Sequence, residues 1–288
     1  MSNDVQYLSR PEGRIAYELV GRPDAPLVVL APGMGDLRST WRDLVGPLTD
    51  AGYRVASMDL RGHGDSDTTF ATHGDVVTGQ DLIAIVEHLG GTPAVLGGNS
   101  MGAAAAAWAA AERPDLVAGL VLTAPILRDP PASAATTAAL HGAERVAIAG
   151  PWGAALWARM VRTHFGRGQQ GTWFDEHVAD IKAALQRPGH LRSFRHLALQ
   201  LTHAPVEARL PEVTAPVVAF VGSVDPDYKD PAAEATWLRS AVDAEVTFIP
   251  DVGHYPQHQA PQVVIDDTLA FLASLPRAGG TFAAEALA

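Results

Sequence analysis

The 288-residue chain contains no cysteine. Without a thiol it can form neither a disulfide framework nor a thiolate zinc site, and a cysteine nucleophile is excluded as well. Positive charge is also scarce, because 21 Lys and Arg face 32 Asp and Glu, which gives a formal net charge of −11. Nucleic acids and anionic membranes attract positively charged surfaces, so we expect neither as a partner.

Long apolar segments are missing too. The opening residues, MSNDVQYLSRPEGR, are polar and lack the apolar stretch of a secretory signal peptide. The longest apolar run lies in the alanine-rich segment 94–111, and it is too short and too small-sided to span a bilayer. We therefore expect a cytoplasmic protein that acts on a small-molecule substrate, while the sequence leaves the oligomeric state open.

Short apolar runs alternate with helix-like segments along most of the chain. Hydrophobic residues make up 47% of the sequence, which is enough for a sizeable buried core. Six runs bounded by Gly or Pro are typical of buried parallel strands: 26–32, 53–60, 93–98, 118–125, 215–222 and 244–250. Helical patterns occupy 38–51, 75–90, 100–112, 231–242 and 261–274. This alternation predicts an α/β fold with a doubly wound, mostly parallel sheet.

Two segments depart from the alternation. The opening VQYLSRPEGRIAYELVG predicts an antiparallel β-hairpin at the sheet edge, with its turn at Pro11–Gly13. From about Leu127 to Pro211 there are helix-length pieces and no good strand, which predicts a helical cap inserted before the last two strands. The expected organisation is a core formed by 1–126 and 213–275, a helical cap over 127–212 and a flexible tail over 276–288.

Residues 98–102, Gly-Asn-Ser-Met-Gly, stand between an apolar strand and an alanine-rich helix. They match the G-x-S-x-G nucleophile elbow, whose context is a strand before the motif and a helix after it. The serine of such an elbow sits on a sharp, strained turn, and the flanking glycines avoid collisions with the neighbouring strand and helix. Ser100 is therefore the candidate nucleophile.

A nucleophilic serine needs a base and an orienting acid, which follow it in the order acid, then His, in this kind of fold. His254 lies just beyond the last predicted strand, at the sheet edge expected for Ser100. Asp225 follows the strand 215–222 and is the candidate acid, with Asp227 as a weaker rival. The sequence therefore predicts a Ser100–His254–Asp225 triad that needs neither a metal nor a cofactor.

Two backbone N–H groups are candidates for an oxyanion hole. One belongs to Met101 at the start of the helix that follows Ser100, and the other to Met34 in the loop Pro32-Gly33-Met34-Gly35. The aromatic and methionine side chains of the cap are candidates for lining an apolar acyl pocket. The predicted substrate-binding residues are Gly33, Trp152, Trp157, Met160 and Tyr255.

Five motifs, PGMG, DLRGHGDS, GNSMG, GSVD and GHYP, together resemble the α/β-hydrolase superfamily, in particular its esterase- and haloperoxidase-like members with a helical cap. The resemblance extends from the N-terminal hairpin to about Leu275, and it implies the α/β-hydrolase fold. It also implies a structural turn role for His63 in DLRGHGDS. Related enzymes usually begin the oxyanion loop with His-Gly, whereas this chain has Pro32-Gly33 and lacks the hydrogen bonds of that histidine.

The predicted activity is hydrolysis of a carboxylic ester or lactone of a small to medium, largely apolar substrate, through an acyl-enzyme. Haloalkane dehalogenases and epoxide hydrolases of the superfamily resemble one another in using Asp at the elbow, so Ser100 argues against both. Three alternatives stay open: a carbon–carbon hydrolase of ring-cleavage (dienoate) products, a cofactor-free haloperoxidase or perhydrolase, and a small-molecule receptor on the same fold.

The carbon–carbon hydrolase alternative rests on the likeness of GNSMG to the elbow of that family. Those enzymes characteristically place an arginine of the cap near a carboxylate of the substrate. Arg159, Arg162, Arg192 and Arg195 are the candidates here, although charges on a helix face are more often simply solvated.

Overall fold

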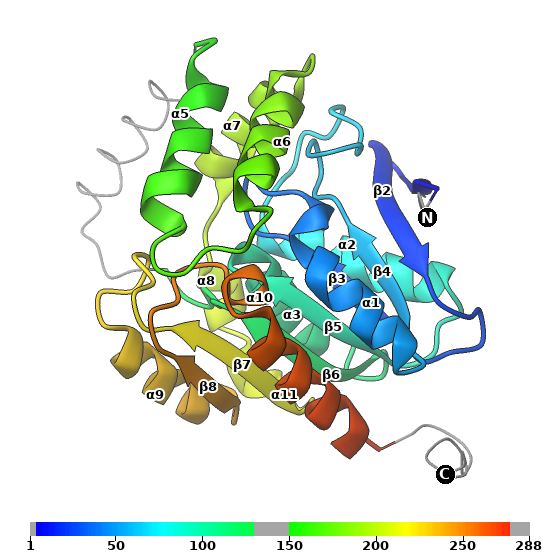
Figure 1. Ribbon diagram of the computed structural model, residues 1–288. Helices are drawn as coiled ribbons and strands as arrows, with labels where there is room; N and C mark the ends of the chain where they lie inside the picture. Colours follow the sequence, from blue (N-terminus) through cyan, green and yellow to red (C-terminus); the bar gives the residue numbers. More distant parts are fainter. Residues whose placement is uncertain (1–3, 130–149, 277–288) are drawn as a thin grey trace.

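An eight-stranded sheet with the strand order β1-β2-β4-β3-β5-β6-β7-β8 forms the centre of the computed structural model, which describes residues 4–129 and 150–276 (Figure 1). The strands are β1 (Gln6–Arg10), β2 (Gly13–Val20), β3 (Leu27–Ala31), β4 (Arg54–Met58), β5 (Ala94–Asn99), β6 (Val117–Thr123), β7 (Val217–Gly222) and β8 (Glu245–Ile249). β1 pairs with β2 and β2 with β4 in antiparallel fashion, and all other neighbours are parallel. The predicted hairpin and the doubly wound, mostly parallel sheet are therefore confirmed.

Helices cover both faces of this sheet because its central strands bury side chains on both sides. On β3, Val28 and Leu30 join one apolar cluster, while Leu27, Val29 and Ala31 join the other, as the two-residue period of a strand requires. The first cluster packs against α1 (Arg42–Asp50) and α11 (Pro261–Ser274), and the second against α2 (Asp75–His88), α3 (Met101–Glu112) and α9 (Pro231–Ala241). Two short helices, η1 (Arg38–Trp41) and α10 (Pro256–Gln259), directly precede α1 and α11 in the chain.

The segment between β6 and β7 is helical throughout its described part. It contains α5 (Gly153–Met160), a π-helical turn (Val161–Phe165), α6 (Phe174–Gln186), α7 (His190–Gln200), α8 (Ala204–Glu207) and η3 (Leu210–Glu212). Figure 1 shows α5, α6 and α7 grouped together beyond one side of the sheet. Their apolar faces form a cluster that includes Trp157, Phe174 and Phe194, and Tyr255 of the core packs into it. These helices therefore pack directly on the loop that follows β8.

Two parts of the predicted organisation lie outside the described residues, namely residues 130–149 of the predicted cap and residues 277–288 of the predicted tail. Within the described residues, no helix combines the length and the apolar character needed to cross a membrane.

The junction of β5 and α3 depends on two glycines. A Cβ at Gly98 would lie 2.1 Å from the carbonyl carbon of Gly102, and a Cβ at Gly102 would lie 2.6 Å from the carbonyl oxygens of Ala31 and Pro32. Both distances are far shorter than van der Waals contact. The alanines 103–107 that follow are buried, so the first turns of α3 lie close against the sheet. Glycine is therefore required at both positions, because any side chain would collide with the backbone.

We predict that Gly98→Ala destabilises the fold by about 3 kcal/mol or more, because the added methyl group meets backbone that cannot move away. The melting temperature should fall by roughly 6–12 °C in a calorimetric scan. The matched control is Gly46→Ala in α1, where a Cβ meets nothing within 4 Å. There the better helix propensity of alanine is opposed by the steric restriction that Pro47 places on the residue before it, so the stability should change by less than about 1 kcal/mol. Equal melting temperatures for the two variants would contradict this account of the elbow.

Candidate active site

Ser100 occupies the turn between β5 and α3 with φ 55° and ψ −117°, a conformation that side chains other than glycine rarely adopt. Its N–H donates to the carbonyl of Thr123 at 3.0 Å, and its own carbonyl accepts the N–H of Ala103 at 3.0 Å. Strain of this kind costs about 1–3 kcal/mol and persists only where the surroundings impose it. Here the two backbone hydrogen bonds and the close contact of α3 with the sheet impose it.

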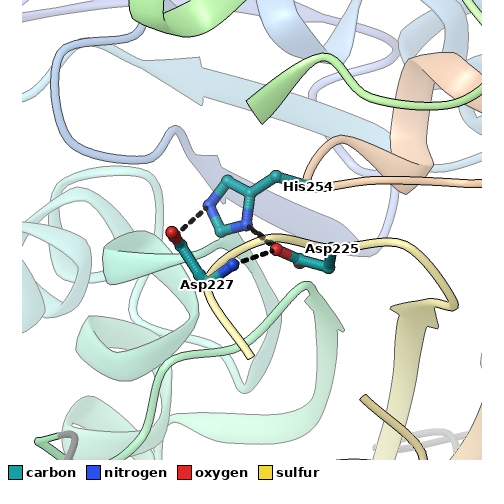
Figure 2. Close-up of side chains that lie close together, drawn as sticks. All are labelled: Asp225, Asp227 and His254. Atoms are coloured by element: carbon teal, nitrogen blue, oxygen red, sulfur yellow. Dashed lines mark hydrogen bonds and ion pairs between the residues drawn. The ribbon is translucent and has the colours of Figure 1, made fainter. Parts of the chain in front are cut away.

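His254 and Asp225 come together from the loops after β8 and β7 (Figure 2). His254 Nδ1 lies 2.9 Å from Asp225 Oδ2 and 3.1 Å from Asp225 Oδ1, and both side chains are buried. A carboxylate can only accept, so Nδ1 carries the proton and Nε2 is left to act as a base. The loop of His254 is fixed on two sides, because its N–H donates to the carbonyl of Phe165 and its carbonyl accepts from Asn99 Nδ2, each at 3.1 Å.

Ser100 and His254 line one small cavity of about 40 Å³. Its other lining residues are Gly33, Met34, Asn99, Trp157, Phe165, Asp227 and Tyr255. The structure thus brings the predicted nucleophile and the predicted base to one cavity, and it hydrogen-bonds the predicted acid to that base. The predicted binding residues Gly33, Trp157 and Tyr255 line the same cavity.

Asp227, predicted only as a rival acid, contacts the opposite side of the imidazole. Its Oδ2 lies 3.5 Å from His254 Nε2, and its backbone N–H donates to Asp225 Oδ1 at 3.0 Å. Figure 2 shows the ring of His254 between the two carboxylates. The sequence does not reveal this placement, because both aspartates follow the same strand and only the folded loop decides which ring nitrogen each one approaches.

The two carboxylates control the protonation of His254. Burial opposes the imidazolium, but Asp225 and Asp227 outweigh it and raise the pKa of His254 to about 9. The pKa of Asp227 is itself raised, because desolvation exceeds the stabilisation that its carboxylate receives from His254. The resting site therefore favours a charged imidazolium beside Asp227.

The predicted oxyanion donors lie where the chain passes Ser100. Met34 lines the cavity, and within the described ranges no acceptor pairs with its N–H. The N–H of Met101 belongs to the first turn of α3, where backbone donors have no partner inside the helix. A Cβ at Gly33 would lie 3.2 Å from the Cβ of Ser100, so the loop passes close to the serine.

His63 and Trp157 hold the loop that carries the predicted oxyanion donor Met34. The N–H of Gly35 donates to His63 Nε2 at 3.2 Å, and Trp157 Nε1–H donates to the carbonyl of Gly35 at 2.9 Å. His63 Nδ1 faces the carbonyl of Arg61 at 3.0 Å, which assigns the proton to Nδ1 and leaves Nε2 as an acceptor. Burial lowers the pKa of His63 to about 4, so this tautomer stays neutral. A histidine distant in sequence thus binds the loop that lacks the usual His-Gly.

Two of the predicted substrate-binding residues do not line this cavity. Trp152 is 57% exposed and Met160 is 36% exposed. The buried face of α5 and the following turn consists of Ala154, Trp157, Ala158 and Val161, and Met160 lies outside it. Trp152 precedes the helix and packs near Gly150. The role of these two residues in substrate binding stays a prediction, while Phe165 lines the cavity.

Asp225, Asp227 and His254 also offer ligand atoms that lie within 4.8 Å of one another. An ion bound at His254 Nε2 would leave Asp225 in its contact with Nδ1, so the group supplies such an ion with two ligands at most. Catalytic zinc sites use three protein ligands. The arrangement fits a hydrogen-bonded imidazole better than a metal site.

A larger cavity of about 770 Å³ lies elsewhere, between α1, α6 and the β2–β4 edge. Four of its charged lining residues pair with one another, since Arg38 contacts Glu18 and Asp65, and Arg187 contacts Asp65. Ser100, Asp225 and His254 are all absent from its lining. We therefore assign the candidate active site to the smaller cavity.

The sequence model of the alpha/beta hydrolase family matches residues 28–267, so the chain belongs to this family and is an enzyme of the hydrolase kind. It is 24% identical over 230 residues to 3-oxoadipate enol-lactonase 2 of Acinetobacter baylyi, covering 76% of this chain and 79% of the relative. Over 92 residues it is 36% identical to epoxide hydrolase A of Mycobacterium tuberculosis, covering 31% of this chain and 29% of the relative.

Among solved structures, a thermophilic esterase from Thermogutta terrifontis superimposes with a TM-score of 0.75 at 24% identity, covering 94% of this chain and 98% of the esterase. This likeness shows a shared fold. The match to the mycobacterial epoxide hydrolase spans less than a third of that protein.

We predict that His254 titrates near pH 9, whereas His63 titrates near 4, because carboxylates surround the first ring and burial is the largest influence on the second. Heteronuclear NMR of the ring nitrogens measures both values. Asp227→Asn should lower the pKa of His254 and leave that of His63 in place. A His254 pKa near 6.5 in the wild type would contradict the described contact with two carboxylates.

Proposed function

We propose that this enzyme is a serine hydrolase that cleaves a carboxylic ester or lactone of a small to medium, largely apolar substrate through an acyl-enzyme. One observation carries the proposal: Ser100 sits on a strained elbow in the same cavity as His254, whose Nδ1 is hydrogen-bonded to buried Asp225. This is the arrangement that activates a serine hydroxyl by an oriented base.

In the proposed reaction, Ser100 Oγ attacks the carbonyl carbon while His254 Nε2 takes its proton. The developing oxyanion receives hydrogen bonds from the N–H groups of Met34 and Met101, and each such donor is typically worth about 2.7–4 kcal/mol of barrier. His254 then gives its proton to the departing alkoxide. Water, deprotonated by His254, attacks the acyl-enzyme and releases the acid and free Ser100. Asp225 keeps the imidazole oriented throughout.

The composition of the cavity supports this choice of bond. Its walls are largely apolar, through Met34, Trp157 and Phe165, and its volume of about 40 Å³ favours a short acyl group beside Ser100. An enol-lactonase is among the relatives in sequence. Ser100 at the elbow argues against the haloalkane dehalogenases and epoxide hydrolases of the superfamily, which resemble one another in using aspartate there.

The carbon–carbon hydrolase alternative receives no support from the cavity. Its described lining contains no arginine, and Arg162 pairs with Asp175 on the surface of the cap. The lining carries a carboxylate, Asp227, which would repel an anionic dienoate. An ester or lactone without a carboxylate of its own suits this cavity better.

We predict that Ser100→Ala abolishes turnover of p-nitrophenyl acetate and that Asp225→Asn lowers kcat by about 10³–10⁴-fold, through loss of the nucleophile and of the correct imidazole tautomer. Initial rates of nitrophenolate release measure both. Ser240→Ala, which removes an exposed hydroxyl on α9, is the matched control and should keep wild-type rates. Full turnover by Ser100→Ala would refute the proposal.

We predict that kcat/KM for this ester increases about tenfold per pH unit below 9 and levels off above it. Only neutral His254 can accept the serine proton, and its pKa of about 9 keeps most of it charged at pH 7. Rates between pH 6 and 10 at constant ionic strength measure the profile, and Asp225→Asn should not reproduce it. A plateau reached already at pH 7 would show that the carboxylates do not control the base.

A further inference from the structure

We propose that Asp227 makes this site selective for esters that carry an ammonium group, which would lie at the mouth of the cavity between this carboxylate and the aromatic walls. The inference rests on the proposed function, because it concerns the substrate of the same cavity. It assigns to Asp227 the role of a specificity-determining residue rather than that of a second orienting acid.

The chemistry of the cavity walls points to a cation. Among the described lining residues, Asp227 is the one charged group apart from His254, and neither lysine nor arginine is present. Three aromatic side chains, Trp157, Phe165 and Tyr255, line the same space. Aromatic faces attract ammonium ions electrostatically, most strongly where water is partly excluded. Together with a carboxylate they form a cavity that suits a positive charge and opposes a negative one.

Asp227 is placed to meet a ligand and lacks a firm partner of its own. Its side chain is 30% exposed, whereas that of Asp225 is fully buried. Within the described residues its one ion pair is with His254 Nε2 at 3.5 Å, which is longer than a good hydrogen bond. The imidazoles of His164 and His203 act on it only at longer range. An exposed carboxylate with neither a lysine nor an arginine among the described lining residues gains from a cation that the substrate brings.

The same contact links binding to catalysis. While Asp227 faces Nε2, the charged form of His254 is favoured, and that form cannot take the proton of Ser100. An ammonium group beside Asp227 would neutralise its charge and leave Nε2 free to face the serine. A cationic ester therefore gains twice, through its own attraction to Asp227 and through a more available base. A neutral ester of the same shape gains neither advantage.

A pair of isosteric thioesters tests this proposal. Acetylthiocholine carries a trimethylammonium group, and 3,3-dimethylbutyl thioacetate replaces its nitrogen by carbon. The released thiol is measured with a chromogenic disulfide, and the protein adds no background because it contains no cysteine. We expect the wild type to prefer the cationic thioester by about tenfold or more in kcat/KM. Asp227→Asn should bring this ratio close to one.

Asp251→Asn is the matched control. Asp251 is an exposed acid on the loop before His254, its backbone has φ 56°, which asparagine tolerates well, and it does not line the cavity. This variant should keep the wild-type preference. If it loses the preference as well, the effect is due to the general negative charge at this edge, and the assignment to Asp227 is wrong.

The remaining outcomes separate this inference from the proposed function. Equal kcat/KM for the two thioesters in the wild type overturns the role of Asp227 and leaves the serine hydrolase intact. If neither thioester is turned over, a second experiment compares how fast two fluorophosphonates label Ser100, one with a trimethylammonium group and one with a tert-butyl group. Faster labelling by the cationic reagent, slowed in Asp227→Asn, supports the inference. Equal labelling rates overturn it. Failure of both reagents to label Ser100 contradicts the proposed function, and the inference fails with it.

Discussion

The contact between the end of β5 and the start of α3 is the constraint on which the site depends. Gly98 and Gly102 allow the two backbones to meet at a distance that no side chain permits, and the buried alanines after them keep the helix against the sheet. Ser100 takes up the sharp change of direction with a positive φ. The adjoining Asn99 extends the effect, because its amide donates to the carbonyls of Thr123 and His254 and so ties the elbow to the histidine loop.

The helical segment between β6 and β7 takes part in this arrangement directly. The carbonyl of Phe165 accepts the N–H of His254, and the indole of Trp157 donates to the carbonyl of Gly35 in the loop after β3. Both aromatic rings also line the cavity. The same two residues therefore position two loops and line the cavity, so the placement of His254 and the shape of the cavity are coupled.

Local patterns predicted the features that local sequence controls. Short runs bounded by Gly or Pro predicted the parallel strands, and the two glycines around Ser100 predicted the elbow, because few other residues fit such a turn. Two contacts were not predicted. The hydrogen bond between His63 and Gly35 joins loops that are distant in sequence. The contact of Asp227 with Nε2 of His254 depends on how the loop after β7 bends, which the sequence does not reveal. Composition alone did not separate Trp157, which lines the cavity, from Met160, which does not, because it does not reveal which face of a helix turns inward.

The central claim is that Ser100 is a nucleophile activated by the His254–Asp225 pair, and a covalent intermediate tests it most directly. Rapid quenching of the enzyme with p-nitrophenyl acetate, followed by mass spectrometry of the Ser100 peptide, would detect the acyl group. We expect one acetyl group on Ser100 that forms with the burst of nitrophenolate and is absent from Ser100→Ala. Turnover of the ester with no acetyl on Ser100, or acetyl on another residue at the rate of turnover, would contradict it.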